Sequence, residues 1–147
     1  MNRFLLQQQP DDKTCMCTCL AMLIGESAEY IIGKYHQHMY DDRSTWFDDV
    51  FDEIGIEYRY GHPKNGAINW GEAALLTVGS LNFEGTMHQI LVWAEDGKFY
   101  VADPQAGKDG RKYYVAHEPQ DDMQVQLSGW RLDIAIPLNQ KFFEDAA

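Results

Sequence analysis

The sequence predicts a single α+β domain over residues 1–147, with helices in the first half of the chain and an antiparallel β-sheet in the second. Apolar residues recur at helical spacing as far as Ile54, and short strand-like runs separated by turn residues follow from Thr77 onward. Such segregation is typical of α+β domains, whose helices pack on the sheet. A chain of 147 residues can bury one core without disulfides or a metal.

Three helices are expected before the sheet, over about residues 13–24, 27–39 and 44–54. Gly25 and Gly55 follow the first and third helix, and glycine is the residue that most often ends a helix. The third helix carries a core-facing stripe of apolar residues at helical spacing, namely Trp46, Phe47, Val50, Phe51 and Ile54.

The starts of these helices are predicted from capping residues. Asp11 or Asp12 is expected to cap the first helix, Ser27 the second, and Ser44 or Thr45 the third. Their side-chain oxygens can accept hydrogen bonds from the free N–H groups of a first turn.

Strands are expected in the rest of the chain, with one interruption. Asn69 and Glu72 have the spacing of a capping box, which predicts a short helix as far as Leu76. A turn at Glu95-Asp96-Gly97 should join two of the strands into a hairpin. The predicted strands span residues 56–60, 77–83, 89–94, 98–102, 112–115, 123–127 and 130–136.

Charge and apolar content exclude several partners. A net charge of -11 would repel nucleic acids and anionic membrane surfaces. The longest early apolar run, residues 19–25, is too short to span a membrane and does not follow a basic stretch, so neither an anchor nor a signal peptide is expected. The three cysteines all lie within residues 15–19, which favours a reducing compartment, the cytoplasm of the producing cell or of a cell that the protein enters.

Cys15 is the candidate nucleophile. In the first turn of a helix, free backbone N–H groups and the positive end of the helix dipole stabilise a thiolate. Cys17 points about 200° away from its neighbours on the helix, so Cys15, Cys17 and Cys19 cannot share one metal ion. His36 and His38 would have to complete a zinc site but face opposite sides of a helix. No metal or other cofactor is therefore predicted.

Three further residues complete a candidate catalytic site. His88 opens the strand 89–94 and Asp103 ends the strand 98–102, so an antiparallel hairpin would place them side by side. Asp103 could then orient His88 toward the Cys15 thiol. Gln9, six residues before Cys15, could bind a developing oxyanion together with the backbone N–H of Cys15. His62 and His117 have no acid partner presented by a hairpin.

The residues around these positions resemble the papain-like cysteine peptidases, and among them the bacteriocin-processing, double-glycine leader peptidase-like domains. The resemblance covers about residues 7–107: Gln9 to Cys15, Thr18-Cys19-Leu20-Ala21-Met22, His88 with the apolar strand after it, and Val101-Ala102-Asp103-Pro104 with Gly107. It implies a papain-like fold, with Gln9 as oxyanion-hole donor, Cys15 as nucleophile, His88 as general base and Asp103 as orienting acid. Thr14 and Met16 stand where the family usually has an acidic residue and a glycine.

The predicted function is therefore hydrolysis of an amide bond in a protein or peptide substrate through a thioester intermediate. Two alternatives remain open: a glutamine deamidase or transglutaminase-like effector with the same triad, and a binding module that has lost its chemistry. The protein could be a bacterial or phage protein that acts on one host protein. Trp70 or Trp130 and the loop 107–122 are candidates for the walls of a substrate cleft. The sequence does not indicate an oligomeric state.

Overall fold

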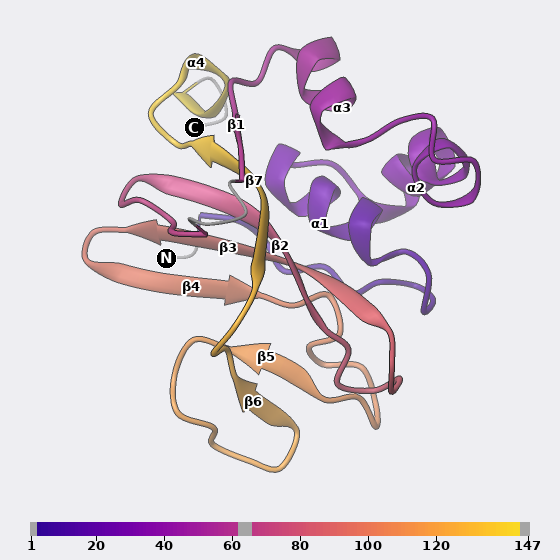
Figure 1. Cartoon of the computed structure of the whole chain (residues 1–147), viewed down its shortest axis with the longest axis vertical. Coiled ribbons are helices and arrows are strands. Elements are labelled where there is room, and N and C mark those ends of the chain that lie inside the picture. Colours follow the sequence, from indigo (N-terminus) through magenta and orange to yellow (C-terminus); the bar gives the residue numbers. More distant parts are fainter. Residues whose placement is uncertain (1–2, 62–65, 145–147) are drawn as a thin grey trace.

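The computed structural model describes residues 3–61 and 66–144 as helices followed by a sheet (Figure 1). The helical part contains α1 (Cys15–Ile24), α2 (Ala28–His36), a π-helical turn η1 (Gln37–Asp41) and α3 (Phe47–Ile54). A short helix, α4 (Lys141–Glu144), follows the last strand. The predicted order, N-terminal helices before an antiparallel sheet, is confirmed.

The main sheet has five strands in the order β1-β7-β2-β3-β4, and each neighbouring pair is antiparallel. Its strands are β1 (Arg59–Tyr60), β2 (Glu72–Gly79), β3 (Met87–Glu95), β4 (Lys98–Ala102) and β7 (Arg131–Pro137). A separate pair, β5 (Tyr113–Val115) and β6 (Gln124–Gln126), is parallel. The prediction that these two strands belong to the antiparallel sheet is therefore wrong.

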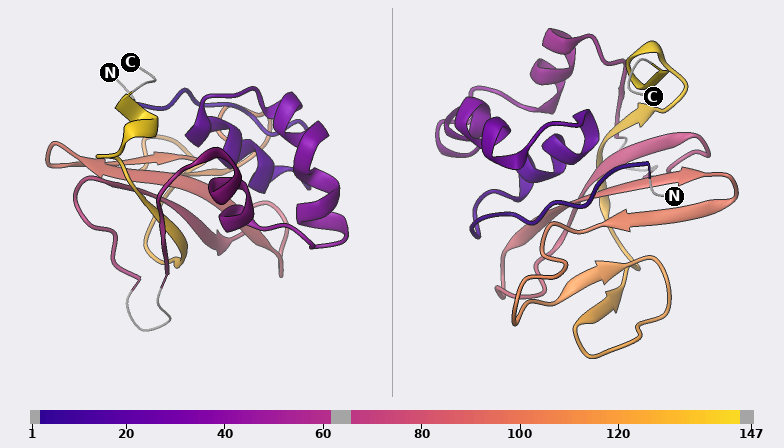
Figure 2. Two further views of the ribbon diagram at one scale, coloured as in Figure 1. Left: turned by 90° about the horizontal axis from the view of Figure 1, so that it is seen from above. Right: turned by 180° about the vertical axis from the view of Figure 1, so that it is seen from behind.

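The two faces of the main sheet are covered differently. Figure 2 shows α1, α2 and α3 grouped on one face, where Leu75 and Leu91 of the sheet pack with Leu20 and Phe51 of the helices. The opposite face, which includes Ile90, is covered in part by residues from the segments around β5 and β6. Successive residues of a strand point to opposite faces of the sheet. Since both faces are covered, β2 and β3 are buried along almost their whole length, as expected for strands covered on both sides.

The predicted short helix from Asn69 to Leu76 is wrong, because its residues from Glu72 onward belong to the central strand β2. The Asn69 N–H does donate to Glu72 Oε1, at 2.8 Å, but at the turn into the strand rather than at a helix start. Residues 73–78 are all buried between β3 and β7. A helix could not fill a place that requires ladder hydrogen bonds on both edges.

Several helix and strand boundaries also differ from the prediction. Ser27 does cap α2, since its side chain accepts a hydrogen bond from the Tyr30 N–H, and the end of the second helix continues through η1 to Asp41. The third helix begins later than predicted, at Phe47, because the N–H and hydroxyl of Ser44 donate to the Asp42 carboxylate and Ser44 does not cap the helix. The strand predicted over residues 56–60 is reduced to β1, and the strand predicted over 77–83 overlaps only the end of β2.

The central place of β2 leads to a stability prediction. Leu75 is fully buried (0% exposed), and its replacement by alanine should lower the free energy of unfolding by about 2–5 kcal/mol, because the lost contacts leave a cavity. Leu5, which is 84% exposed, provides the matched control, and Leu5→Ala should change that free energy by less than about 0.5 kcal/mol. Urea denaturation measures both values. Equal stability of the two variants would contradict this account of the core.

Candidate active site

The hairpin of β3 and β4 brings His88 and Asp103 together. Asp96 and Gly97 form its two-residue turn, and both have positive φ, 54° and 72°, as the tightest hairpin turns require. The register pairs Leu91 with Ala102, so the start of β3 and the residue after β4 lie at the same end of the sheet. His88 Nε2 and Asp103 Oδ1 are 2.6 Å apart, and this contact agrees with the sequence-based expectation.

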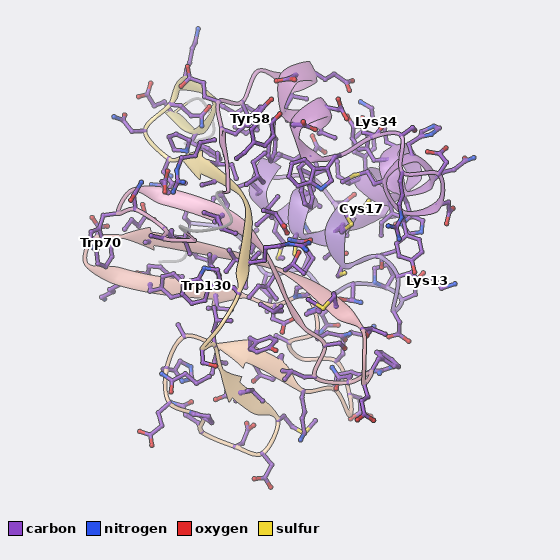
Figure 3. All side chains as sticks on the ribbon, viewed as in Figure 1. Lys13, Cys17, Lys34, Tyr58, Trp70 and Trp130 are labelled. Carbon is purple, nitrogen blue, oxygen red and sulfur yellow. The ribbon has the colours of Figure 1, made fainter. Side chains whose placement is uncertain are left out.

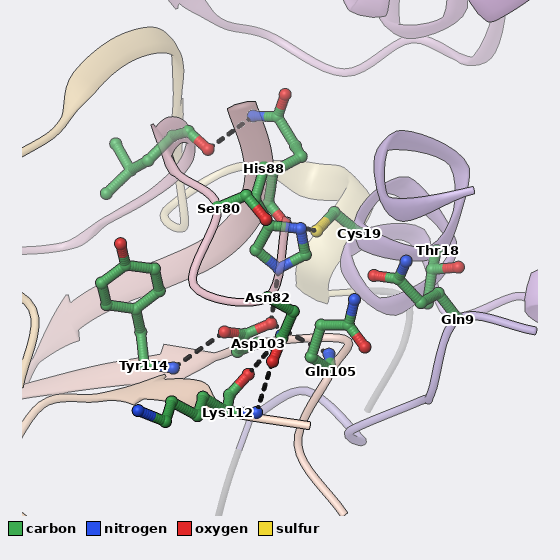
Figure 4. A network of polar contacts seen from close by, with 12 residues as sticks. Gln9, Thr18, Cys19, Ser80, Asn82, His88, Asp103, Gln105, Lys112 and Tyr114 are labelled. Atoms are coloured by element: carbon green, nitrogen blue, oxygen red, sulfur yellow. Dashed lines mark hydrogen bonds and ion pairs between the residues drawn. The ribbon is translucent and has the colours of Figure 1, made fainter. Parts of the chain in front are cut away.

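Backbone groups hold the Asp103 carboxylate in place. Its Oδ1 accepts a hydrogen bond from the Gln105 N–H at 2.9 Å, and its Oδ2 accepts one from the Tyr114 N–H at 2.8 Å. Figure 4 shows the carboxylate between His88 and Tyr114. The Tyr114 hydroxyl in turn donates to the Gly79 carbonyl at 2.6 Å, which fastens β5 to the end of β2. Asp103 is 1% exposed, so these bonds fix the carboxylate in the interior.

Cys15 is the first residue of α1, as the sequence predicts for the candidate nucleophile. The cap differs from the prediction, because Thr14 stands before the helix and its Oγ1 donates to the Asp11 carbonyl. The Asp11 carboxylate instead accepts the Lys13 N–H, so residues 11–14 form a turn that starts the helix two residues later. The helix ends at Gly25, whose φ of 79° is left-handed. The Cys15 backbone is thus at the N-terminal end of the helix, where N–H groups have no partner within the helix.

Cys15 and His88 line the same cavity, which has a volume of about 470 Å³. Asp103 holds Nε2 of His88, so Nδ1 is the ring nitrogen that remains for the Cys15 thiol. A hydrogen bond with Cys15 contributes to the raised pKa of the imidazole. The sulfur is half-buried, the imidazole is 8% exposed and the carboxylate is 1% exposed. Solvent access to this row of three groups therefore falls from the thiol to the acid.

His88 has a strongly shifted pKa. Burial lowers the pKa of the imidazole, but the hydrogen bonds to Asp103 and Cys15 and the negative charge of both partners outweigh burial and raise it to about 9. The site therefore favours a positively charged imidazole between two groups that can be negative. Such an imidazolium can supply a proton at neutral pH.

Cys17 and Cys19 lie in the core and differ in chemistry from Cys15. Burial raises the pKa of the Cys17 thiol to about 12, and burial together with nearby negative groups also raises the pKa of Cys19. Cys19 Sγ donates to the Gln89 carbonyl. Both thiols are protonated packing groups at neutral pH, as is common for buried cysteine.

His36 and His38, the two histidines a zinc site would need, have other contacts. The His36 ring stacks on Tyr40 with 5.2 Å between ring centroids, and His38 Nδ1 lies 2.9 Å from Asp42 Oδ2. In the described part of the chain, no three His, Cys, Asp or Glu side chains are grouped as metal ligands would be. His117 contacts the Glu118 carbonyl, and His62 lies outside the described residues.

Gln9 lies near the site but does not line the cavity of Cys15 and His88. Its backbone N–H donates to the Pro104 carbonyl at 3.0 Å, which fixes it beside the loop that carries Asp103. Its side chain is 1% exposed, with Nε2 donating to the Asp11 carbonyl at 2.8 Å and Oε1 lacking a partner among the described residues. One N–H of the amide remains available. Its role as an oxyanion donor stays a prediction.

Sequence reasoning missed most of the cavity walls. One wall comes from Met16 and from the connection between α2 and α3, including Met39, Arg43 and Trp46. The other comes from the sheet, including the polar residues Thr77, Gln89, Arg131 and Asp133. Alternation alone would place Asp133 on the face opposite Ile134, and Thr77 on the face of Leu75, which packs with Ile134. The irregular register of β2 and β7 at Leu75 and Leu76 brings Asp133 beside Thr77, and the sequence does not show it.

The tryptophans proposed as cleft walls lie elsewhere. Figure 3 shows Trp70 and Trp130 well separated from Cys17 and its helix. Trp70 is 66% exposed, and the Trp130 indole donates to the Gly66 carbonyl. The segment 107–122 is also absent from the cavity lining, although it contains β5, whose Tyr114 N–H holds Asp103.

Comparison with known proteins leaves the chain without a family assignment. Neither a protein-family model nor a curated protein matches the sequence. Within the described residues, no helix has the length and apolar content that a membrane span needs.

The His88 pKa provides a prediction about the site. The imidazole should titrate near pH 9, and Asp103→Asn should lower this pKa, because the variant removes the negative charge that stabilises the imidazolium. Since the folded-state pKa of His88 exceeds the ordinary value of 6.5, the contribution of this imidazole to the free energy of unfolding is fully present below about pH 6.5. It is lost as the pH rises through about 9.

NMR titration of the His88 ring measures this pKa. Asp42→Asn is the matched control, because it removes an exposed carboxylate that bonds another histidine, His38. It should leave the His88 titration unchanged. An identical His88 midpoint in wild type and Asp103→Asn would show that the carboxylate does not govern the imidazole.

Proposed function

We propose that the protein is a cysteine-dependent hydrolase of papain-like fold that cleaves an amide bond in a protein or peptide substrate. The main support is the orientation of His88, whose Nε2 is held by Asp103 while Nδ1 remains for Cys15. A histidine fixed in this way between a carboxylate and a thiol is the arrangement that activates a cysteine nucleophile. The position of Cys15 at the start of α1 and its access to a cavity agree with this role.

In the proposed mechanism, the Cys15 sulfur attacks the carbonyl carbon of the amide as a thiolate, and a carbon–sulfur bond forms. The negative charge moves to the carbonyl oxygen, where the Cys15 backbone N–H and the remaining N–H of Gln9 stabilise it. When the carbon–nitrogen bond breaks, the His88 imidazolium gives its proton to the leaving amine. The product of this half-reaction is a thioester on Cys15.

The second half-reaction returns the enzyme to its starting state. Neutral His88 takes a proton from water, and the hydroxide attacks the thioester carbon. The carbon–sulfur bond breaks, a carboxylic acid leaves, and the sulfur and imidazole regain their ion pair. Asp103 keeps the imidazole in one orientation in both steps and does not itself take the proton.

The reactivity of the three cysteines tests the nucleophile. With limiting iodoacetamide below pH 7, the label should appear on Cys15 within minutes, whereas Cys17 and Cys19, which are 1% and 0% exposed, should remain unlabelled in the folded protein. Mass spectrometry of proteolytic fragments identifies the labelled residue. Equally slow labelling of all three thiols would favour a binding module that has lost its chemistry.

The reaction itself is tested on a proteome. Wild-type protein incubated with a bacterial lysate should create new protein N-termini that are absent with Cys15→Ala, because the variant has no nucleophile. His88→Ala should reduce cleavage at least about 100-fold, since it removes both proton transfers. His117→Ala removes a histidine outside the cavity and should cleave like wild type.

Mass spectrometry of the same samples separates the alternatives. Glutamine-to-glutamate conversion without new N-termini would indicate a deamidase. If wild type produces neither new N-termini nor this conversion beyond the Cys15→Ala background, the hydrolase proposal is ruled out.

A further inference from the structure

The cavity of Cys15 and His88 contains a second polar group of residues, which the proposed reaction does not use. This group consists of Thr77, Gln89, Arg131 and Asp133, and all four line the cavity. Thr77 comes from β2, Gln89 from β3, and Arg131 with Asp133 from β7. Three adjacent strands therefore contribute to it, on the sheet side of the cavity.

Asp133 organises this group but is not free to bind a substrate. Its Oδ2 accepts hydrogen bonds from Thr77 Oγ1 and Gln89 Nε2, and its Oδ1 accepts one from Arg131 Nε. The side chain is 9% exposed. A carboxylate whose two oxygens are both occupied, and which is nearly buried, gives a basic substrate little to bind.

Arg131 has the opposite character. Its Nε donates to Asp133 at 3.0 Å and its Nη2 to Thr77 at 3.1 Å, which hold one edge of the guanidinium. The side chain is nonetheless 72% exposed, so the remaining N–H groups can reach a ligand. A guanidinium fixed in this manner loses little side-chain entropy when it binds a carboxylate.

Arg43 adds a second cation to the same cavity. It lies on the connection between α2 and α3, on the other wall. Its guanidinium has no acidic partner among the residues that the structure describes. The carboxylate next to it in the sequence, Asp42, bonds Ser44 and His38 instead. Asp133 is the one acidic residue of the described chain that lines the cavity, against two arginines.

The local charge is therefore positive in a protein whose net charge is -11. At physiological ionic strength, charges beyond about 8 Å are largely screened, so groups in contact with a substrate decide its binding. We infer that the cleft selects a peptide segment with an acidic side chain, Asp or Glu, close to the bond that is cleaved, with Arg131 and Arg43 as the residues that recognise it. This inference rests on the proposed hydrolase function.

A library of peptides with randomised sequences tests the inference, with the cleaved positions read by mass spectrometry. Wild-type protein should cut with about fivefold enrichment of Asp and Glu over Lys and Arg within three residues of the cleaved bond, the range expected for exposed charge pairs. The enrichment should shrink in 1 M NaCl, where the Debye length is about 3 Å.

Two variants assign the enrichment to the arginines. Arg43→Glu should abolish or reverse it, and Arg131→Gln should weaken it and raise KM more than it lowers kcat, because the contact already exists in the bound substrate. Lys34→Gln removes an exposed lysine outside the cavity that pairs with Glu53, and it should leave the enrichment as in wild type.

The possible outcomes separate this inference from the hydrolase proposal. If wild type cleaves no peptide that Cys15→Ala leaves intact, both the hydrolase proposal and the charge selection are overturned. Cleavage without acidic enrichment, or enrichment that neither Arg43→Glu nor Arg131→Gln changes, would overturn the charge selection alone and leave the hydrolase standing. Because Arg43 is exposed and has no ion-pair partner in the described chain, its variant remains informative if Arg131→Gln disturbs the fold.

Discussion

The contact between His88 and Asp103 constrains the whole neighbourhood of the candidate site. A charged imidazole that is almost buried requires a negative partner, and a carboxylate that is 1% exposed requires hydrogen-bond donors of its own. The donors come from the loop after β4 and from β5, while the hairpin of β3 and β4 supplies the pair itself. The α1 helix then has to approach this end of the sheet for its first residue to meet the ring.

The sequence could predict the elements that local rules determine. The stripe of Phe47, Val50 and Phe51 has helical spacing, and all three residues are buried in α3. Asp96-Gly97 forms the hairpin turn because both residues tolerate positive φ, and this turn fixes the register that joins His88 to Asp103. Two residues fifteen positions apart could thus be paired without coordinates.

Features that depend on long-range packing could not be predicted in this way. The sequence from Asn69 to Leu76 satisfies a helix-capping pattern, yet residues 72–76 form a strand, because β3 and β7 pair with both of its edges and apolar residues cover both of its faces. The polar cavity wall depends on β7 lying beside β2, although more than 50 residues separate Thr77 from Arg131. Gln9 shows the limit of motif reasoning, since its amide bonds Asp11 and its place in the reaction stays a prediction.

The anchoring of Asp103 by main-chain groups affects how such a site can change during evolution. The residues at positions 105 and 114 contribute their N–H groups, which every amino acid except proline possesses. As far as this role is concerned, their side chains can vary while the carboxylate stays in place. Two chains with different residues at these positions could therefore share the same geometry, and a pattern of side chains would not reveal it.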